Sequence, residues 1–257
     1  MADDRDWLGL VEHEPGRFTL ELTEDLIRLD GQLYGGTGLA AAVGAFSATT
    51  GRSPLWTTVQ FVGTARLGDT LDIDVEQLAK GRSTTQTRLT AWHDGEVVLA
   101  ALGSSGELRD DVIEADFGTM PDASDPETAP SWDHMVPIDL SGKFGPFKTA
   151  EFRRASEGTT AMMWLRMHDM RQTVETIAYL ADFVPAGVVR AAGRVGVGIS
   201  LDNSIRFGPA PDTEWILVDV DPYFARGGFL HGGARIWSQD GVLLAVAAQT
   251  SRARMFD

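Results

Sequence analysis

Several residue types and patterns are missing from this 257-residue chain, and each absence excludes a class of protein. The sequence has no cysteine, so it holds no disulfide framework, no thiol nucleophile and no cysteine metal site. It carries 22 basic residues against 37 acidic ones, a formal net charge of −15. Binding to nucleic acid or to an anionic membrane surface needs a basic patch, so this charge argues against both. No apolar run reaches about 18 residues without a charge, so we expect no transmembrane helix.

The histidines and the first residues exclude two further features. The five histidines do not show the spacing of metal ligands, so we expect no metal site. The opening Met1-Ala2-Asp3-Asp4 is acidic and precedes no long apolar core, unlike a signal peptide. What remains is globular, because 43% of the residues are hydrophobic, enough for a real core. We therefore expect a cytoplasmic protein.

The stretch Tyr34-Gly35-Gly36-Thr37-Gly38 organises the first half of the chain. It leads into an Ala-rich apolar run that predicts a helix from about Thr37 to Thr50, ending at Gly51, with Thr37 as a candidate N-cap. Gly35 and Gly36 lack a Cβ, so another group can approach the backbone closely. The helix start offers free N–H groups that can hold an anion or polarise a carbonyl. Tight packing alone is the other explanation for these glycines.

Strand patterns fill most of the remaining chain. In the first half, a strand near residues 17–22 precedes the helix, and four antiparallel strands follow it between residues 55 and 103. Asp94-Gly95 separates two of these strands, which is a strong hairpin signal. Residues 106–138 are rich in Asp, Glu, Pro and Ser, and they predict a solvated acidic linker. Beyond it, apolar residues at helical spacing predict one helix from about Val174 to Val184, among further strands.

The two halves repeat each other. Val59-Gln60-Phe61 matches Ile205-Arg206-Phe207, and Asp94-Gly95 matches Asp240-Gly241, at an offset of 146 residues (205 − 59 = 240 − 94 = 146). The offset slips to 145 only between two single-residue length changes. A nearly constant offset predicts a duplicated unit, each copy being one helix and a curved antiparallel sheet. We therefore expect an α+β fold with units at residues 1–105 and 139–257, joined by the linker at 106–138.

On these features the sequence resembles the acyl-CoA thioesterase II family, whose fold is a double hot-dog. The likeness covers the Tyr34-Gly35-Gly36 stretch and four further stretches, at residues 75–83, 201–207, 214–217 and 239–249. It implies two tandem hot-dog units, hydrolysis of acyl-CoA to free acid and CoA, a place in fatty acid metabolism, and no cofactor. It leaves open whether the protein is a homo-oligomer.

The resemblance also implies site residues. The family is thought to hold a water near the thioester with an Asp, a Gln and a hydroxyl residue, which fall on Asp202, Gln249 and a position near Tyr223. Gly35 and Gly36 would supply donors to the thioester oxygen. This sequence departs from the family pattern at Asn203, where the family has His, and around Phe207, where Arg206 and Gly208 replace an aromatic residue and a His. These changes bear on the rate more than on the fold.

The chemistry of these residue types fits hydrolysis. A carboxylate beside an apolar cleft can act as a base, and an amide can orient a water because it both donates and accepts. Two other functions stay open at this point. One is a catalytically weak acyl-CoA binding or scaffold protein of the same fold. The other, a hot-dog hydratase, would use Asp202-Asn203 followed by a His, and no His follows nearby.

Overall fold

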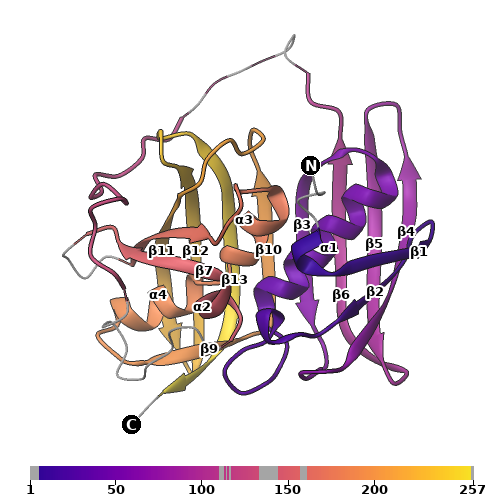
Figure 1. Ribbon diagram of the computed structural model, residues 1–257, viewed down its shortest axis with the longest axis horizontal. Coiled ribbons are helices and arrows are strands. Elements are labelled where there is room, and N and C mark those ends of the chain that lie inside the picture. The colour runs from indigo at the N-terminus through magenta and orange to yellow at the C-terminus, as the bar shows by residue number, and fades with distance from the viewer. Residues whose placement is uncertain are drawn as a thin grey trace.

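The computed structural model describes residues 6–109, 113, 115, 117–132, 144–156 and 161–255, and its strands form one antiparallel sheet (Figure 1). The sheet order is β1-β2-β4-β5-β6-β3-β10-β13-β12-β11-β8-β7, with β9 pairing to β13 as the thirteenth strand. The strands of the first half are β1 (Leu10–Glu14), β2 (Arg17–Glu21), β3 (Ser53–Phe61), β4 (Thr70–Lys80), β5 (Thr84–His93) and β6 (Glu96–Gly106). Those of the second half are β7 (Ala150–Arg154), β8 (Met162–Met167), β9 (Gly196–Ser200), β10 (Asp202–Phe207), β11 (Ile216–Arg226), β12 (Phe229–Ser238) and β13 (Leu243–Met255).

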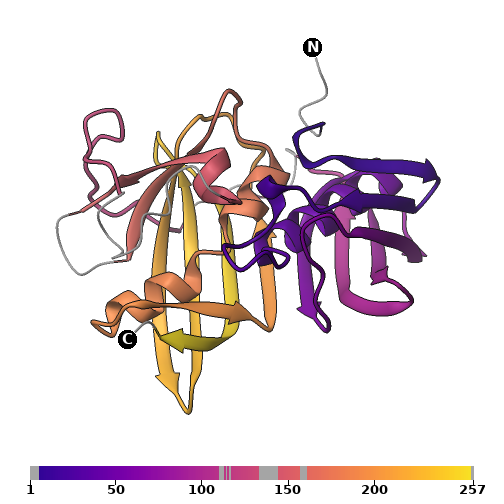
Figure 2. The same cartoon turned by 60° about the horizontal axis from the view of Figure 1, so that its bottom comes forward.

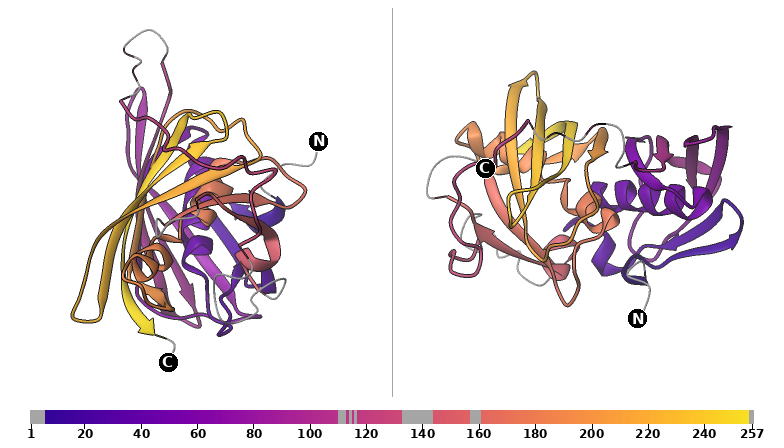
Figure 3. Two further views of the ribbon diagram at one scale, coloured as in Figure 1. Left: turned by 90° about the vertical axis from the view of Figure 1, so that its left-hand side faces the viewer. Right: turned by 90° about the horizontal axis from the view of Figure 1, so that it is seen from above.

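The helices lie against one face of this sheet. They are α1 (Gly35–Thr50), α2 (Pro146–Thr149), α3 (Val174–Leu180) and α4 (Val184–Ala191), with short 3₁₀ turns at η1 (Asp6–Leu8) and η2 (Glu24–Leu26). Seen from above, α1 lies between the strands of its own unit, and the second unit stands beside it (Figure 3). None of the helices in the described ranges has the length and hydropathy that crossing a bilayer requires.

Helix α1 has no polar face because it is enclosed. Every residue from Gly35 to Phe46 is buried, which explains the unbroken apolar run in the sequence. The helix begins at Gly35, two residues before the predicted start, with Tyr34 as its N-cap. Thr37 is not the cap, since its hydroxyl donates to the backbone oxygen of Leu26 instead. The helix ends as predicted at Gly51, which takes a left-handed conformation with φ of 64°.

The second half holds two short helices where the apolar spacing predicted one. Helix α3 ends at Leu180, a turn follows at residues 181–183, and α4 starts at Val184. Pro185 does not end a helix here, because it sits in the first turn of α4, where a missing N–H costs nothing. The prediction was wrong at this point because Pro marks a helix start as well as a helix end. The turn that results carries Asp182.

The predicted duplication is visible in the pairing of the two units. Strand β3 of the first unit pairs antiparallel with β10 of the second, and Thr58 lies opposite Ser204. These two residues differ by the repeat offset (204 − 58 = 146), so a pseudo-twofold axis passes between them. The units stand side by side around this strand pair, seen from a second direction in Figure 2. The sheet therefore runs through both units without a break.

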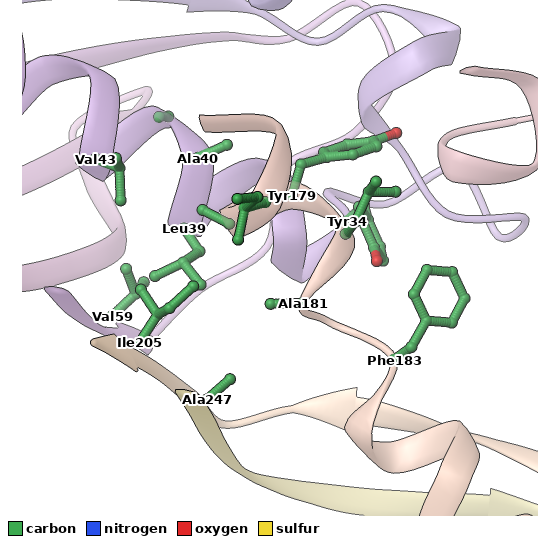
Figure 4. Close-up of a cluster of buried hydrophobic side chains, with 14 of the residues drawn as sticks. Tyr34, Leu39, Ala40, Val43, Val59, Tyr179, Ala181, Phe183, Ile205 and Ala247 are labelled. Carbon is green, nitrogen blue, oxygen red and sulfur yellow. The ribbon is translucent and has the colours of Figure 1, made fainter. Parts of the chain in front are cut away.

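The two units share one hydrophobic core. Leu39 of α1, Val59 of β3 and Ile205 of β10 are fully buried in the same cluster, and Figure 4 shows their side chains together. Truncating a buried side chain of this size typically costs about 2–5 kcal/mol of folding free energy. Residues from both units contribute to this cluster, so neither unit completes its core alone.

The acidic segment after β6 differs from the solvated linker that its composition predicted. Among its described residues, those around 124–132 contact the second unit, whereas Ile113 and Phe117 are exposed. The indole of Trp164 donates to the backbone oxygen of Ser124 (2.7 Å), and the indole of Trp215 donates to Glu127 Oε1 (2.7 Å). Trp132 is 7% exposed and belongs to the main core. Residues 133–138, with the predicted boundary before residue 139, lie outside the described residues, so the unit limits stay a prediction.

Candidate active site

One carboxylate collects hydrogen bonds from both units. Asp182 lies in the turn between α3 and α4, and its Oδ1 accepts from Gln249 Nε2 (2.5 Å), Asn203 Nδ2 (3.1 Å) and Ser200 Oγ (3.2 Å). Its Oδ2 accepts from the backbone N–H of Gly36 (3.0 Å). The first three donors belong to the second unit and the fourth to the first, so this network spans the pseudo-twofold axis.

The sheet register brings the three side-chain donors together. Strand β13 carries Gln249 and pairs along one edge first with β10 and then with β9, which carry Asn203 and Ser200. Ser200 lies opposite Ser251, two residues beyond Gln249, so the side chains of Ser200 and Gln249 emerge on the same face. Gln249 Nε2 also donates to Ser200 Oγ (2.8 Å), which ties the two together. The group is therefore held by strands and does not depend on a mobile loop.

The first turn of α1 completes the site, and its glycines are required there. A Cβ on Gly36 would collide with the backbone oxygen of Tyr179 and the ring of Tyr34. A Cβ on Gly35 would lie 2.6 Å from Asp182 Oδ2 and 2.7 Å from Ser200 Oγ. Because both positions lack a side chain, the positive end of the helix reaches the carboxylate directly. The N–H of Gly36 is thus engaged by Asp182.

The surroundings of Asp182 shift its acidity. Burial raises the pKa of Asp182 from 3.8 to about 6, although the donors Gln249, Ser200 and Gly36 and the charge of Arg28 each act to lower it. By its solvent exposure the residue is only partly buried. At pH 7 the group is mainly ionised but close to its titration point, which is where a general base works best.

Aromatic rings form the apolar side of the site. Tyr34 packs edge-on against Tyr179 with 5.1 Å between ring centroids, and Phe183 lies 6.4 Å from Tyr34. Figure 4 shows these three rings next to Ala181, directly before Asp182 in the chain. Burial and the nearby charge of Asp182 raise the pKa of Tyr34 well above its usual value. These apolar rings belong to the buried surroundings that raise the pKa of Asp182.

The residues expected from the sequence take different places. Gln249, Gly35 and Gly36 lie in the site, and Gln249 is 4% exposed. Asp202 makes another contact, since its Oδ1 accepts from the backbone N–H of Thr250 (2.8 Å). Tyr223 is 58% exposed on β11, and its hydroxyl lies over Gly233 of β12. The geometry thus moves the candidate base from Asp202 to Asp182 and the candidate hydroxyl from Tyr223 to Ser200.

Two signals in the sequence could have found Asp182. It is the single charged residue in the apolar stretch 176–189, and a lone carboxylate in a buried stretch is a candidate for a functional group. It also follows Gly36 by the repeat offset (182 − 36 = 146), so it occupies the position equivalent to the first turn of α1. Within the described residues, no cluster of three or more His, Cys, Asp or Glu side chains could hold a metal ion.

Comparison with known proteins identifies what this arrangement is similar to. The acyl-CoA thioesterase N-terminal domain family matches residues 27–106, and the acyl-CoA thioesterase C-terminal domain family matches residues 114–253. Among curated protein sequences there is no match to this chain.

Solved structures align with nearly the whole chain. A predicted thioesterase from Novosphingobium aromaticivorans is 29% identical with a TM-score of 0.86, and 95% of this chain and 97% of that chain are covered. A TesB protein from Mycobacterium avium subsp. paratuberculosis is 22% identical with a TM-score of 0.78, covering 96% of both chains. The acyl-CoA thioesterase II TesB2 from Mycobacterium marinum is 20% identical with a TM-score of 0.72, covering 97% of both chains. The double hot-dog fold that the resemblance implied is thereby confirmed.

Proposed function

Because this chain belongs to the acyl-CoA thioesterase family and is a thioesterase, we propose that it hydrolyses acyl-CoA with Asp182 as the base that activates water. The observation that carries this proposal is the Asp182 network itself. A partly buried carboxylate with a pKa of about 6 is held by donors from both units at the start of α1. This replaces the mechanism through Asp202, whose carboxylate is bound to a backbone N–H.

In the proposed reaction, water attacks the thioester carbonyl carbon while its proton passes to Asp182. The tetrahedral intermediate then expels CoA as a thiolate, and Asp182 returns the proton to it, which leaves a free acid and the CoA thiol. Gln249 and Ser200 orient the water. Gln249 Oε1 is buried and has no hydrogen-bond partner among the described residues, so it is an acceptor that suits a water O–H. General-base assistance of this kind is typically worth about 10²–10⁴-fold in rate.

A matched pair of variants tests the assignment. We expect Asp182→Asn to lower kcat by about 10²–10⁴-fold with little change in KM, because it keeps the shape and removes the proton acceptor. Asp202→Asn should stay within a few-fold of the wild type. Thiol release from a panel of saturated acyl-CoAs, from acetyl-CoA to palmitoyl-CoA, measures both. Loss of activity in Asp202→Asn with full activity in Asp182→Asn would refute this site.

The panel also separates hydrolysis from binding. A catalytically weak acyl-CoA binding protein would bind the same panel by titration calorimetry without releasing thiol, and both variants would leave its affinity nearly unchanged. The acyl chain preference follows from the same measurement. The cytoplasmic location and the role in fatty acid metabolism stay predictions from the sequence.

A further inference from the structure

Asn203 is a buried side chain that uses only the donor end of its amide. It is fully buried on β10, and its Nδ2 donates to Asp182 Oδ1 (3.1 Å). Its own Oδ1 is buried with no hydrogen-bond partner among the described residues. Leaving a buried polar atom without a partner typically costs about 1–3 kcal/mol. An asparagine buried at such a cost points to a role for its donor end.

The four donors around Asp182 divide unequally between its two oxygens. A carboxylate oxygen offers about two acceptor sites. Oδ1 receives three side-chain donors, from Gln249, Ser200 and Asn203, so its capacity is filled. Oδ2 receives only the backbone N–H of Gly36 among the described contacts, so one of its acceptor sites remains for a proton.

We propose that Asn203 is a positioning residue of the hydrolysis, which holds Asp182 Oδ1 so that Oδ2 is the oxygen that takes the proton from water. This inference rests on the proposed role of Asp182 as base. Asn203 acts through Asp182 and does not touch the substrate. A neutral amide suits this task because it donates a hydrogen bond at every pH and brings no charge of its own beside the carboxylate.

The pH dependence of the activity can test this proposal if the groups that face Asp182 keep their charge near pH 6. Arg28 lies in the loop before α1, and its positive charge acts to lower the pKa of Asp182. Tyr34 and Tyr179 face it from α1 and α3, and burial raises the pKa of both, so they stay neutral. The nearby carboxylate of Asp202 accepts a backbone N–H on the Thr250 side of β13. Of the charges named for Asp182, its own is therefore the one that titrates near pH 6.

The test compares Asn203→Leu with two other variants. Leucine has a similar size and removes both the donor and the unpartnered oxygen, so we expect the fold to survive, which a thermal melt checks. Asn203→Gln keeps a neutral amide donor. Thr57→Val is the matched control, because Thr57 occupies the equivalent position of the first unit (203 − 57 = 146) and is also buried with an unpartnered hydroxyl among the described residues.

The readout is the pH profile of kcat/KM for the best acyl-CoA of the panel. The acid limb of this profile is the pH range in which kcat/KM falls because the base becomes protonated. In Asn203→Leu the carboxylate loses a hydrogen-bond donor, so its pKa and the acid limb should shift to higher pH by about one unit. At pH 6, kcat/KM should then fall about tenfold. Asn203→Gln should restore the limb toward the wild-type position, and Thr57→Val should leave the profile unchanged.

Two results would overturn the proposal. One is an acid limb of Asn203→Leu at the same pH as in the wild type, whether or not the maximal kcat/KM is lower. A merely structural role of Asn203 would lower only the maximal kcat/KM. The other is a limb that Thr57→Val shifts as much. If Asn203→Leu does not fold, Asn203→Ala is used for the same comparison. Failure of the proposed function is distinguishable, because Asp182→Asn would then keep full activity with an unchanged limb.

Discussion

Replacing Asp182 with asparagine should change how the stability of the protein depends on pH. The pKa of this carboxyl is 3.8 in a free chain and about 6 in the folded protein, with burial as the main cause. Because the folded pKa is the higher one, folding favours the protonated form. The stability that protonation gives is fully present below pH 4 and is lost as the pH rises through 6.

The structure sets the size of this effect. A shift of about two pKa units corresponds to about 3 kcal/mol of folding free energy, since each unit is worth about 1.4 kcal/mol. Asp182→Asn carries no charge, so it does not suffer this loss. Its amide nitrogen must face one of the surrounding donors, which lowers its stability by about 1–3 kcal/mol at every pH. The informative quantity is therefore the difference between variant and wild type as a function of pH.

Thermal unfolding of both proteins from pH 4 to pH 8 measures this difference. We expect the variant to gain about 3 kcal/mol relative to the wild type between pH 4 and pH 7, and the difference to stay flat above that. For a chain of this length the gain corresponds to about 6–12 °C in Tm. Asp202→Asn is the control. A variant-minus-wild-type difference that does not change with pH would refute the raised pKa and with it the argument for Asp182 as base.

Two further predictions concern close approaches of the backbone. Gly35→Ala should lower kcat by about 10²-fold, because its Cβ would lie 2.6 Å from the carboxylate of the candidate base and displace it. Gly44→Ala lies in the same helix, and its Cβ would lie 3.4 Å from the nearest atom, so it should instead raise the unfolding free energy by about 0.5–1 kcal/mol. Equal effects of Gly35→Ala and Gly44→Ala on kcat would contradict this. Gly118→Val should lower the unfolding free energy in urea by about 1–3 kcal/mol, since a Cβ there meets the Trp237 ring at 2.7 Å. The side chain of Phe117 is 96% exposed, so Phe117→Ser should change the unfolding free energy by less than about 0.5 kcal/mol. If Gly118→Val and Phe117→Ser had the same small effect, the segment would be solvated and this prediction would be wrong.

The fold could be predicted because its signals are local. Asp94-Gly95 closes a two-residue hairpin with φ of 50° and 82°, which few other residue pairs adopt. Gly51 ends α1 in a left-handed conformation for the same reason. The repeat offset then fixed the architecture, because two copies of one unit must each bury the same apolar helix. The composition of the acidic segment predicted a solvated linker because the tryptophans that contact this segment lie elsewhere in the sequence. Composition alone does not identify such partners.

The site was harder to predict because it depends on the face of a strand. Asp202 and Asn203 are neighbours on β10, so their side chains point to opposite faces. Asn203 reaches Asp182, and Asp202 reaches the backbone of Thr250 on β13. A motif that contains both residues does not say which of them faces the helix. Gln249 was identified because its strand was correctly aligned, whereas its partner lies 67 residues earlier in a turn that the helix pattern concealed.

The duplication explains why the site can be asymmetric. Gly36 and Asp182 are equivalent by the repeat offset, and they lie across the pseudo-twofold axis, where one donates a hydrogen bond to the other. In a dimer of identical units the same residue would occupy both positions. Two glycines would leave no base, and two side chains would collide, since a Cβ on Gly36 meets the backbone oxygen of Tyr179. A fused chain removes this constraint, so that one unit keeps the acid and the other opens its helix end to hold it.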